Sequence, residues 1–135
     1  MPEPTVAAEM QKRYRAFNAA DPERLRELVA SDVEWGAAGK FPGMERVYRG
    51  PDAVVKWMET VRFEWEEFEV GLDEVLHDGG DLLVVSERLR GRGRESGAEV
   101  EMTVYAAYWF EGDKVKRRAA FTEPEGALLA AGLEP

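Results

Sequence analysis

The chain has 135 residues, of which 44% are hydrophobic and 33% charged, a composition typical of one globular domain over residues 1–135. A net charge of −9 repels phosphate, so no nucleic-acid partner is expected. No apolar run is long enough to cross a bilayer, no signal sequence opens the chain and cysteine is absent, so we expect a cytoplasmic protein with no membrane association and no disulfides.

Three helices are predicted in the first half of the chain. Apolar residues at three- and four-residue spacing indicate a helix over residues 5–20. Asp21 and Pro22 are typical of a helix start, and this second helix is expected to run to about Ala30. Gly50-Pro51-Asp52 opens the third helix. Its inward stripe is predicted to be Val54, Val55, Met58 and Val61, with Trp57 at the flank.

The segment between the second and third helices reads as a short strand and a loop. Residues 32–35 place Val33 and Trp35 on one side of the strand. The loop from Gly36 to Gly50 is rich in glycine but carries Phe41, Met44 and Tyr48. Loops of this kind often close over a pocket.

The second half of the chain predicts an antiparallel meander. Its strands are separated by turns that contain glycine, and a short helix over 125–131 follows the last of them. Helices followed by such a meander indicate an α+β fold. The predicted strands cover residues 68–76, 82–94, 100–110 and 115–122.

Both faces of the strand over 100–110 carry aromatic residues. Tyr105 and Trp109 lie on one face, while Tyr108 and Phe110 lie on the other. One face serves the core, and the other indicates a partner. We therefore expect a homodimer formed through the outer face around Tyr105 and Trp109.

Six segments, spread in order over nearly the whole chain, carry a family resemblance. They are YRAFNAAD (14–21), SDVEW (31–35), YRGPDAVV (48–55), GRGRESG (91–97), YWFEGDKV (108–115) and the terminal ALLAAGL (127–133). Their order resembles the SnoaL-like branch of the nuclear-transport-factor-2-like superfamily, to which the ketosteroid isomerases also belong. This resemblance implies a curved, antiparallel-rich sheet wrapped around three helices, the cystatin-like cone, with an apolar pocket inside and usually a dimer.

The residue pattern of the ketosteroid isomerases is not reproduced. When the motif at Asn18 is used as the anchor, that family's phenol donor falls on Arg13, one place before Tyr14. Its general base falls near Ala37 and its buried acid on Ala106. Proton transfer on a steroid by that apparatus is therefore not expected.

Strand alternation supplies other candidates for chemistry, Glu87 and Arg117. Glu87 shares the more apolar face of its strand, and alternation places Arg117 on the inward face of the last strand. A buried carboxylate needs a counterpart, so the two are expected to pair. The pair is either a structural ion pair or a catalytic site that binds, polarises or deprotonates a ligand carbonyl or hydroxyl. A slip of one residue in register would turn both side chains toward solvent.

The pocket wall is expected to consist of aromatic rings and methionines around a small apolar ligand. Several of these rings carry polar tips that need partners when buried, which favours a cavity over a filled core. The predicted ligand-binding residues are Tyr14, Phe17, Trp35, Phe41, Tyr48, Trp57, Met58, Met102, Tyr108 and Phe121.

Metals and cofactors find little support in the sequence. His77 is the only histidine and is predicted to lie in a turn, so no zinc site is expected. No glycine-rich loop of the phosphate-binding type joins a strand to a helix. The expected function is small-molecule binding of unknown specificity, extended by cofactor-independent isomerase, cyclase or hydrolase chemistry. The alternative is a non-catalytic dimeric binding or interaction module.

Overall fold

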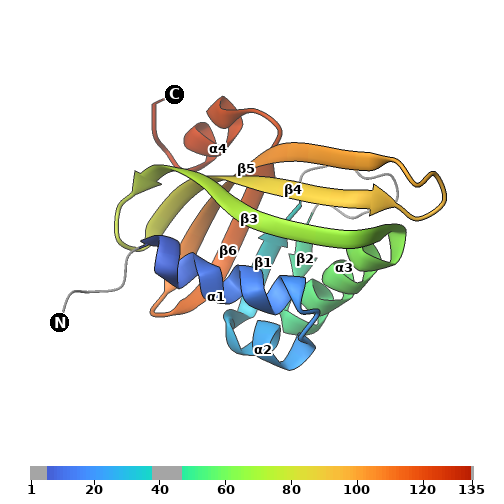
Figure 1. The fold of residues 1–135 in the computed structure, drawn as a ribbon. Coiled ribbons are helices and arrows are strands. Elements are labelled where there is room, and N and C mark those ends of the chain that lie inside the picture. The colour runs from blue at the N-terminus through green and yellow to red at the C-terminus, as the bar shows by residue number, and fades with distance from the viewer. Residues whose placement is uncertain (1–5, 38–46, 135) are drawn as a thin grey trace.

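The computed structural model describes residues 6–37 and 47–134 (Figure 1). Among these residues, three helices and two strands come first, a meander of four strands follows, and a short helix ends the order of elements. The elements are α1 (Val6–Asn18), α2 (Pro22–Glu27), β1 (Val29–Gly36), β2 (Val47–Arg49), α3 (Pro51–Glu64), β3 (Trp65–Asp78), β4 (Leu82–Gly93), β5 (Glu99–Glu111), β6 (Lys114–Phe121) and α4 (Pro124–Ala130).

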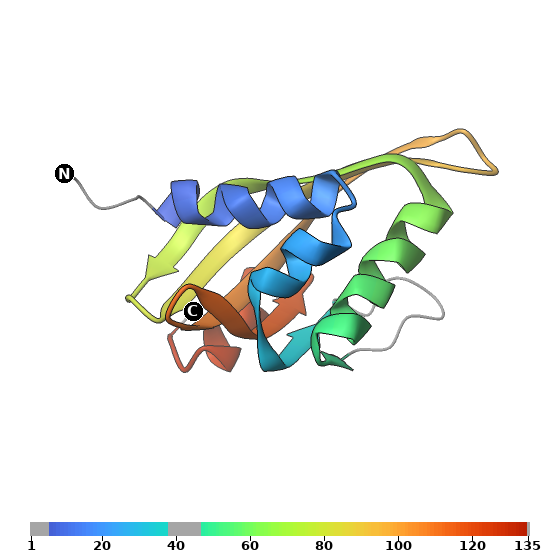
Figure 2. The ribbon, with the colours of Figure 1, turned by 90° about the horizontal axis from the view of Figure 1, so that it is seen from below.

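One curved sheet with helices on both sides forms the architecture. Its strand order is β2-β1-β6-β5-β4-β3, and all neighbours are antiparallel except β1 and β6, which run parallel. Helices α1, α2 and α3 lie together on one side of the sheet, whereas α4 lies against the other (Figures 1 and 2). The predicted α+β class and the curved sheet around three helices are confirmed.

The boundary between α2 and β1 differs from the prediction. Asp21 caps α2 as expected, because its side chain accepts a hydrogen bond from the Arg24 amide at 3.1 Å. The helix nevertheless ends at Glu27, because Val29 and Ala30 already belong to β1. The amide of Val115 donates to the Leu28 carbonyl at 3.0 Å, so pairing with the distant β6 ends the helix early.

Asn18 at the end of α1 fixes this helix to the edge strand β3. Its Nδ2 donates to the Val70 carbonyl at 3.0 Å, and its Oδ1 accepts from the Val70 amide at 2.9 Å. The side chain thereby satisfies both backbone groups of one residue on the edge of the sheet. This contact sets the position of α1, and with it that of Tyr14, over the concave face.

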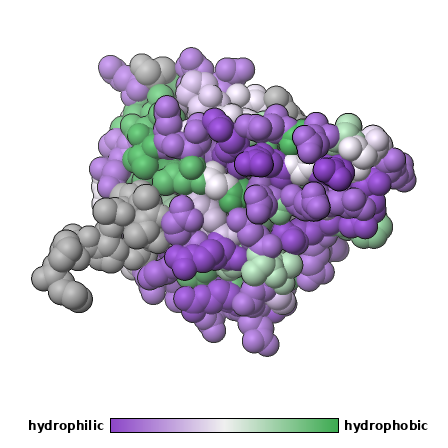
Figure 3. Space-filling view, in the orientation of Figure 1, coloured by the Kyte–Doolittle hydropathy of each residue, from purple (hydrophilic) through white to green (hydrophobic). Residues whose placement is uncertain are grey.

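The two faces of the sheet carry separate apolar clusters. The main core lies between the concave face and the three helices, and it includes all four residues of the predicted α3 stripe as well as Trp57. A smaller cluster on the outer face joins Val84 and Ala107 to Ala127 of α4. The molecular surface is largely hydrophilic, with hydrophobic residues gathered near α4 in this view (Figure 3).

Candidate active site

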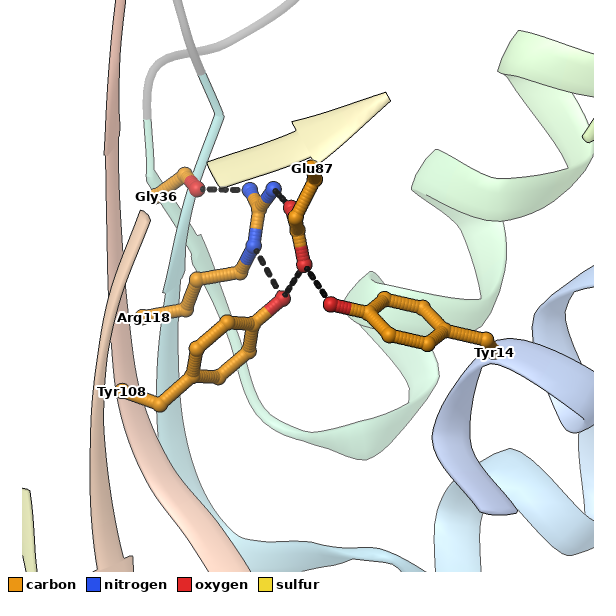
Figure 4. A network of polar contacts seen from close by, with 5 residues as sticks. All are labelled: Tyr14, Gly36, Glu87, Tyr108 and Arg118. Atoms are coloured by element: carbon orange, nitrogen blue, oxygen red, sulfur yellow. Dashed lines mark hydrogen bonds and ion pairs between the residues drawn. The ribbon is translucent and has the colours of Figure 1, made fainter. Parts of the chain in front are cut away.

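A carboxylate is buried on the concave face of the sheet. Glu87 of β4 is only 1% exposed. Its Oε1 accepts a hydrogen bond from Nη2 of Arg118 at 2.7 Å. Its Oε2 accepts hydrogen bonds from the Tyr14 hydroxyl at 2.9 Å and from the Tyr108 hydroxyl. These side chains reach Glu87 from α1, β5 and β6 (Figure 4). The inward orientation predicted for Glu87 is confirmed.

The cation beside Glu87 is Arg118. This side chain is 6% exposed, and each of its three guanidinium nitrogens donates a hydrogen bond. Nε donates to the Tyr108 hydroxyl at 3.0 Å, Nη1 to the Gly36 carbonyl at 2.7 Å, and Nη2 to Glu87. Burial lowers the pKa of Arg118, but the neighbouring Tyr108 and Glu87 outweigh burial and raise it. The guanidinium therefore stays charged.

The inward placement predicted for Arg117 is wrong. Arg117 is exposed, and its guanidinium carbon lies 4.3 Å from the centre of the Trp109 ring on the outer face. The cause is a bulge in β6: Arg117 pairs with Trp109 but Val115 pairs with Phe110, so Lys116 is an extra residue. One inserted residue reverses the alternation beyond it and turns the next side chain inward.

Two tyrosines complete the network around Glu87, which we call the tetrad (Tyr14, Glu87, Tyr108 and Arg118). Burial is the main cause that raises the pKa of Tyr14, and the charge of Glu87 adds to it. Burial likewise raises the pKa of Tyr108, although the nearby Arg118 opposes the shift. Both hydroxyls are therefore neutral donors at ordinary pH, which is the state that the buried carboxylate requires.

Aromatic rings surround the guanidinium of Arg118. Its central carbon lies 5.1 Å from the Trp35 ring centre, 5.8 Å from that of Trp57 and 5.6 Å from that of Tyr108. The indole rings of Trp35 and Trp57 are themselves 5.7 Å apart. Such contacts stabilise a desolvated cation.

A cavity of about 50 Å³ adjoins the tetrad. Room for one water takes roughly 10–15 Å³, so about four water-sized spheres fit. All four members of the tetrad contribute to the wall, and most of the remainder is aliphatic or aromatic. The lining residues are Arg13, Tyr14, Phe17, Leu25, Leu28, Val29, Trp35, Ala37, Trp57, Phe68, Val70, Glu87, Leu89, Val104, Tyr108, Val115 and Arg118.

Comparison with known families decides the identity of this fold. The profile of the SnoaL-like domain matches residues 10–118. The chain belongs to the SnoaL-like family. The match covers the whole cavity wall and every member of the tetrad. A search of curated proteins gave no significant match.

Solved structures share the SnoaL-like fold over nearly the entire chain. An NTF2-like protein from Burkholderia thailandensis is 26% identical, with full coverage of both chains and a TM-score of 0.73. A protein of ketosteroid isomerase-like fold from Catenulispora acidiphila, solved with trimethylamine, is 14% identical; 96% of this chain and 95% of that chain align, with a TM-score of 0.75. A putative SnoaL-like polyketide cyclase from Jannaschia is 15% identical, with full coverage of both chains and a TM-score of 0.71.

Half of the predicted pocket residues line the cavity of this SnoaL-like chain. These five are Tyr14, Phe17, Trp35, Trp57 and Tyr108. Among the others, Met58 lies in the filled part of the core, and Tyr48 packs against Trp57 from outside the cavity wall. Met102 lies farther along β5, beside Leu89 of β4, and Phe41 lies outside the described residues.

The prediction that Phe121 lines the pocket is wrong, for the same reason as the prediction for Arg117. The bulge at Lys116 turns Phe121 to the outer face, where it pairs with Tyr105 and packs in the cluster beneath α4. Gly126 of α4 lies so close that an added Cβ would be 2.8 Å from the Phe121 ring. The ring therefore stabilises the outer face and is not part of the cavity wall.

Sequence reasoning missed Arg118 and most of the aliphatic wall. The run Lys116-Arg117-Arg118 offers a cation to the interior in any register, and nothing in it signals the bulge. Leu25 and Leu28 are not among the predicted ligand-binding residues, yet both line the cavity. Their contribution depends on how α2 packs over the sheet, which periodicity does not specify.

Within residues 6–37 and 47–134, no three His, Cys, Asp or Glu side chains gather so as to hold a metal ion. In the same part of the chain, no helix is long and apolar enough to span a bilayer.

Proposed function

We propose that this SnoaL-like chain binds a small, largely apolar molecule in the cavity beside the tetrad. The observation that carries the proposal is the composition of the wall, which is aliphatic and aromatic except for a few polar groups. Small-molecule sites commonly have this form. The similar protein from Catenulispora acidiphila was solved with trimethylamine, which supports small-molecule binding within this fold.

The tetrad gives the ligand one oriented polar contact. Both carboxylate oxygens of Glu87 and all three nitrogens of Arg118 already have partners within the protein. The Tyr14 hydroxyl donates its only proton to Glu87 and keeps an acceptor position. A ligand hydroxyl or N–H that reaches this position donates to the Tyr14 oxygen, while the rest of the tetrad holds that oxygen in place.

A cavity-filling substitution tests the proposal. Val104→Leu adds a methylene to the wall, whereas Thr103→Val changes the neighbouring residue, which does not line the cavity. Small cyclic molecules, such as cyclopentane derivatives, are expected to bind wild type and Thr103→Val alike and to bind Val104→Leu weakly, as followed by saturation-transfer NMR. Equal binding by all three folded proteins would place the ligand elsewhere.

Proton transfer is a second candidate, favoured by the link that Tyr14 makes between the cavity and Glu87. In this step a ligand C–H or O–H gives its proton to the Tyr14 oxygen, and the original Tyr14 proton passes to Oε2 of Glu87. The electron pair stays on the ligand as an enolate or alkoxide. Exchange of the α-protons of cyclopentanone in D2O, followed by NMR, tests this step. Glu87→Gln and Tyr14→Phe should both abolish the exchange while cyclopentanone still binds.

A non-catalytic dimeric module is the competing function, and two observations favour it. The cavity is small, and the charges of Glu87 and Arg118 satisfy each other. In this case the outer face, around Tyr105 and Trp109, supplies the interaction surface. We propose that it pairs two copies of the chain.

A further inference from the structure

The indole N–H groups of Trp35 and Trp57 are buried donors without an acceptor among residues 6–37 and 47–134. Both nitrogens are shielded from solvent, and neither has a hydrogen-bond partner among the described residues. The two side chains are only 6% and 8% exposed. Buried indole N–H groups usually find a partner, so two orphaned donors in one place call for an explanation.

Both orphaned donors belong to the wall of one cavity. Trp35 comes from β1 and Trp57 from α3, so packing within a single element does not account for the pair. Both rings line the cavity and contact each other at 5.7 Å. In the tetrad, by contrast, every carboxylate oxygen and guanidinium nitrogen has a partner.

We propose that Trp35 and Trp57 form a donor subsite, separate from the tetrad, that receives a hydrogen-bond acceptor atom of an uncharged ligand. The proposal rests on the proposed function, because it assumes that the cavity is the binding site. The ligand class is a small, largely apolar molecule with a carbonyl, ester or ether oxygen. Such an oxygen supplies what an indole N–H lacks and brings no charge into the cavity.

The charges in the wall argue against a cationic ligand. Arg118 already lies against the rings of Trp35 and Trp57, where the cation of an alkylammonium ligand would be attracted. Arg13 adds a second guanidinium to the wall, donating to the Asp113 carbonyl and lying 4.8 Å from the Phe110 ring centre. Trimethylamine, the ligand of the Catenulispora acidiphila protein, is therefore a poor guide to the ligand of this chain.

Three probes of nearly equal shape distinguish the ligand classes. Cyclopentanone carries the acceptor oxygen, methylenecyclopentane replaces C=O by C=CH2, and cyclopentylamine is a cation at pH 7. Their affinities are measured by NMR titration of the full chain with 15N-labelled tryptophan. Trp35→Phe and Trp57→Phe assign the two indole signals. Trp109→Phe is the matched control, because Trp109 lies on the outer face and does not line the cavity.

The expected result is a change in preference rather than in overall binding. Cyclopentanone should move the Trp35 or Trp57 indole proton downfield, and methylenecyclopentane should not. The ketone-to-alkene affinity ratio should fall about tenfold in Trp35→Phe or Trp57→Phe and stay unchanged in Trp109→Phe. Cyclopentylamine should bind at least tenfold more weakly than the ketone.

The outcomes separate the subsite from the proposed function. If ketone and alkene bind with no indole shift and with the same ratio in all variants, the cavity binds ligands but the donor subsite is wrong. Tighter binding of cyclopentylamine than of the ketone would overturn the uncharged ligand class. If no probe binds wild type at millimolar concentration, the proposed function itself fails, and the subsite with it.

Discussion

Arg118 and Glu87 form an ion pair of 2.7 Å between side chains that are 6% and 1% exposed. Two charges so far from solvent stabilise each other only because the remaining hydrogen-bonding positions are filled. Tyr14 and Tyr108 fill those of the carboxylate, and Tyr108 and Gly36 fill those of the guanidinium. The tetrad is thus one unit, whose members should lose stability together.

Removing either charge alone should destabilise the fold strongly. Glu87→Gln leaves the guanidinium unpaired, and Arg118→Met leaves the carboxylate unpaired, so each should cost about 3–5 kcal/mol of unfolding free energy. The double variant Glu87→Gln/Arg118→Met keeps an acceptor for both tyrosine hydroxyls and leaves no unpaired buried charge. It should therefore cost less than either single change. Urea unfolding of the four proteins measures this coupling.

Arg117→Met is the control for this cycle. Arg117 is exposed and lies against the Trp109 ring on the outer face, so its loss should cost less than about 1 kcal/mol. A loss in Arg117→Met as large as that in Arg118→Met would contradict the orientation given by the bulge at Lys116. Additive effects of Glu87→Gln and Arg118→Met would show that the pair is not coupled.

Asn18 should contribute to stability through its two bonds to the backbone of Val70. Asn18→Ala leaves both groups without their partner and should cost about 1–3 kcal/mol, with faster hydrogen exchange at the Val70 amide. Asn18→Asp keeps the acceptor but sets a carboxylate against the Val70 carbonyl, so it should be no better than Asn18→Ala. Full stability of Asn18→Asp would mean that only the Val70 amide matters.

The sequence was sufficient to orient Glu87 because β4 is regular where it pairs with β5. Residues 82–92 of β4 pair with β5 without interruption, so simple alternation predicts every face correctly. Burial of a carboxylate then requires a cation, and this inference was also right. The helical stripe of α3 was predictable for the same reason, since periodicity alone determines which side of a regular element is apolar.

The identity of that cation was not predictable, because it depends on one inserted residue. Lys116 and the residues beside it include no glycine or other sign of a bulge. The effect of the inserted residue appears only in the pairing of β6 with β5. The same inserted residue is the reason why the predicted inward orientation of Phe121 was wrong. The early end of α2 has a similar origin, since Val29 suits a helix as well as a strand until β6 pairs with it. Local sequence patterns therefore mispredict segments whose structure depends on pairing with a strand distant in the sequence.

The outer face should join two copies of the chain. Helix α4 covers Val84 and Ala107, while Tyr105 and Trp109 remain partly exposed. Sedimentation at high micromolar concentration should give a mass near twice 15.2 kDa, and Trp109→Lys should shift it toward the monomer. Phe63→Ser serves as the control, because Phe63 is 74% exposed at the end of α3 and away from this face. A monomeric wild type would contradict the proposed dimer.

Stability should fall steeply in alkali because of Tyr14 and Tyr108. Burial, aided for both by the charge of Glu87, raises their pKa values in the folded protein well above the ordinary value of 10.0. Above pH 10 the unfolded chain therefore releases these two protons while the folded protein keeps them. The unfolded state then binds fewer protons, so the unfolding free energy decreases as pH rises, with a slope that approaches about 1.4 kcal/mol per pH unit for each tyrosine once that residue is fully ionised in the unfolded chain.

Phenylalanine substitutions isolate this effect from other groups that titrate in alkali. Tyr14→Phe and Tyr108→Phe each remove one proton from the balance, so each should reduce the slope of unfolding free energy against pH by about 1 kcal/mol per unit between pH 10 and 11, where the unfolded tyrosine is only partly ionised. The double variant should lose about twice that slope, although it is less stable at pH 7 because Glu87 loses two donors.

Urea unfolding at closely spaced pH values gives the slopes, and tyrosinate absorbance at each pH shows which state has ionised. An identical slope in wild type and double variant would mean that the two hydroxyls ionise in the folded protein as readily as in the unfolded chain. In that case they would not be held as neutral donors to Glu87.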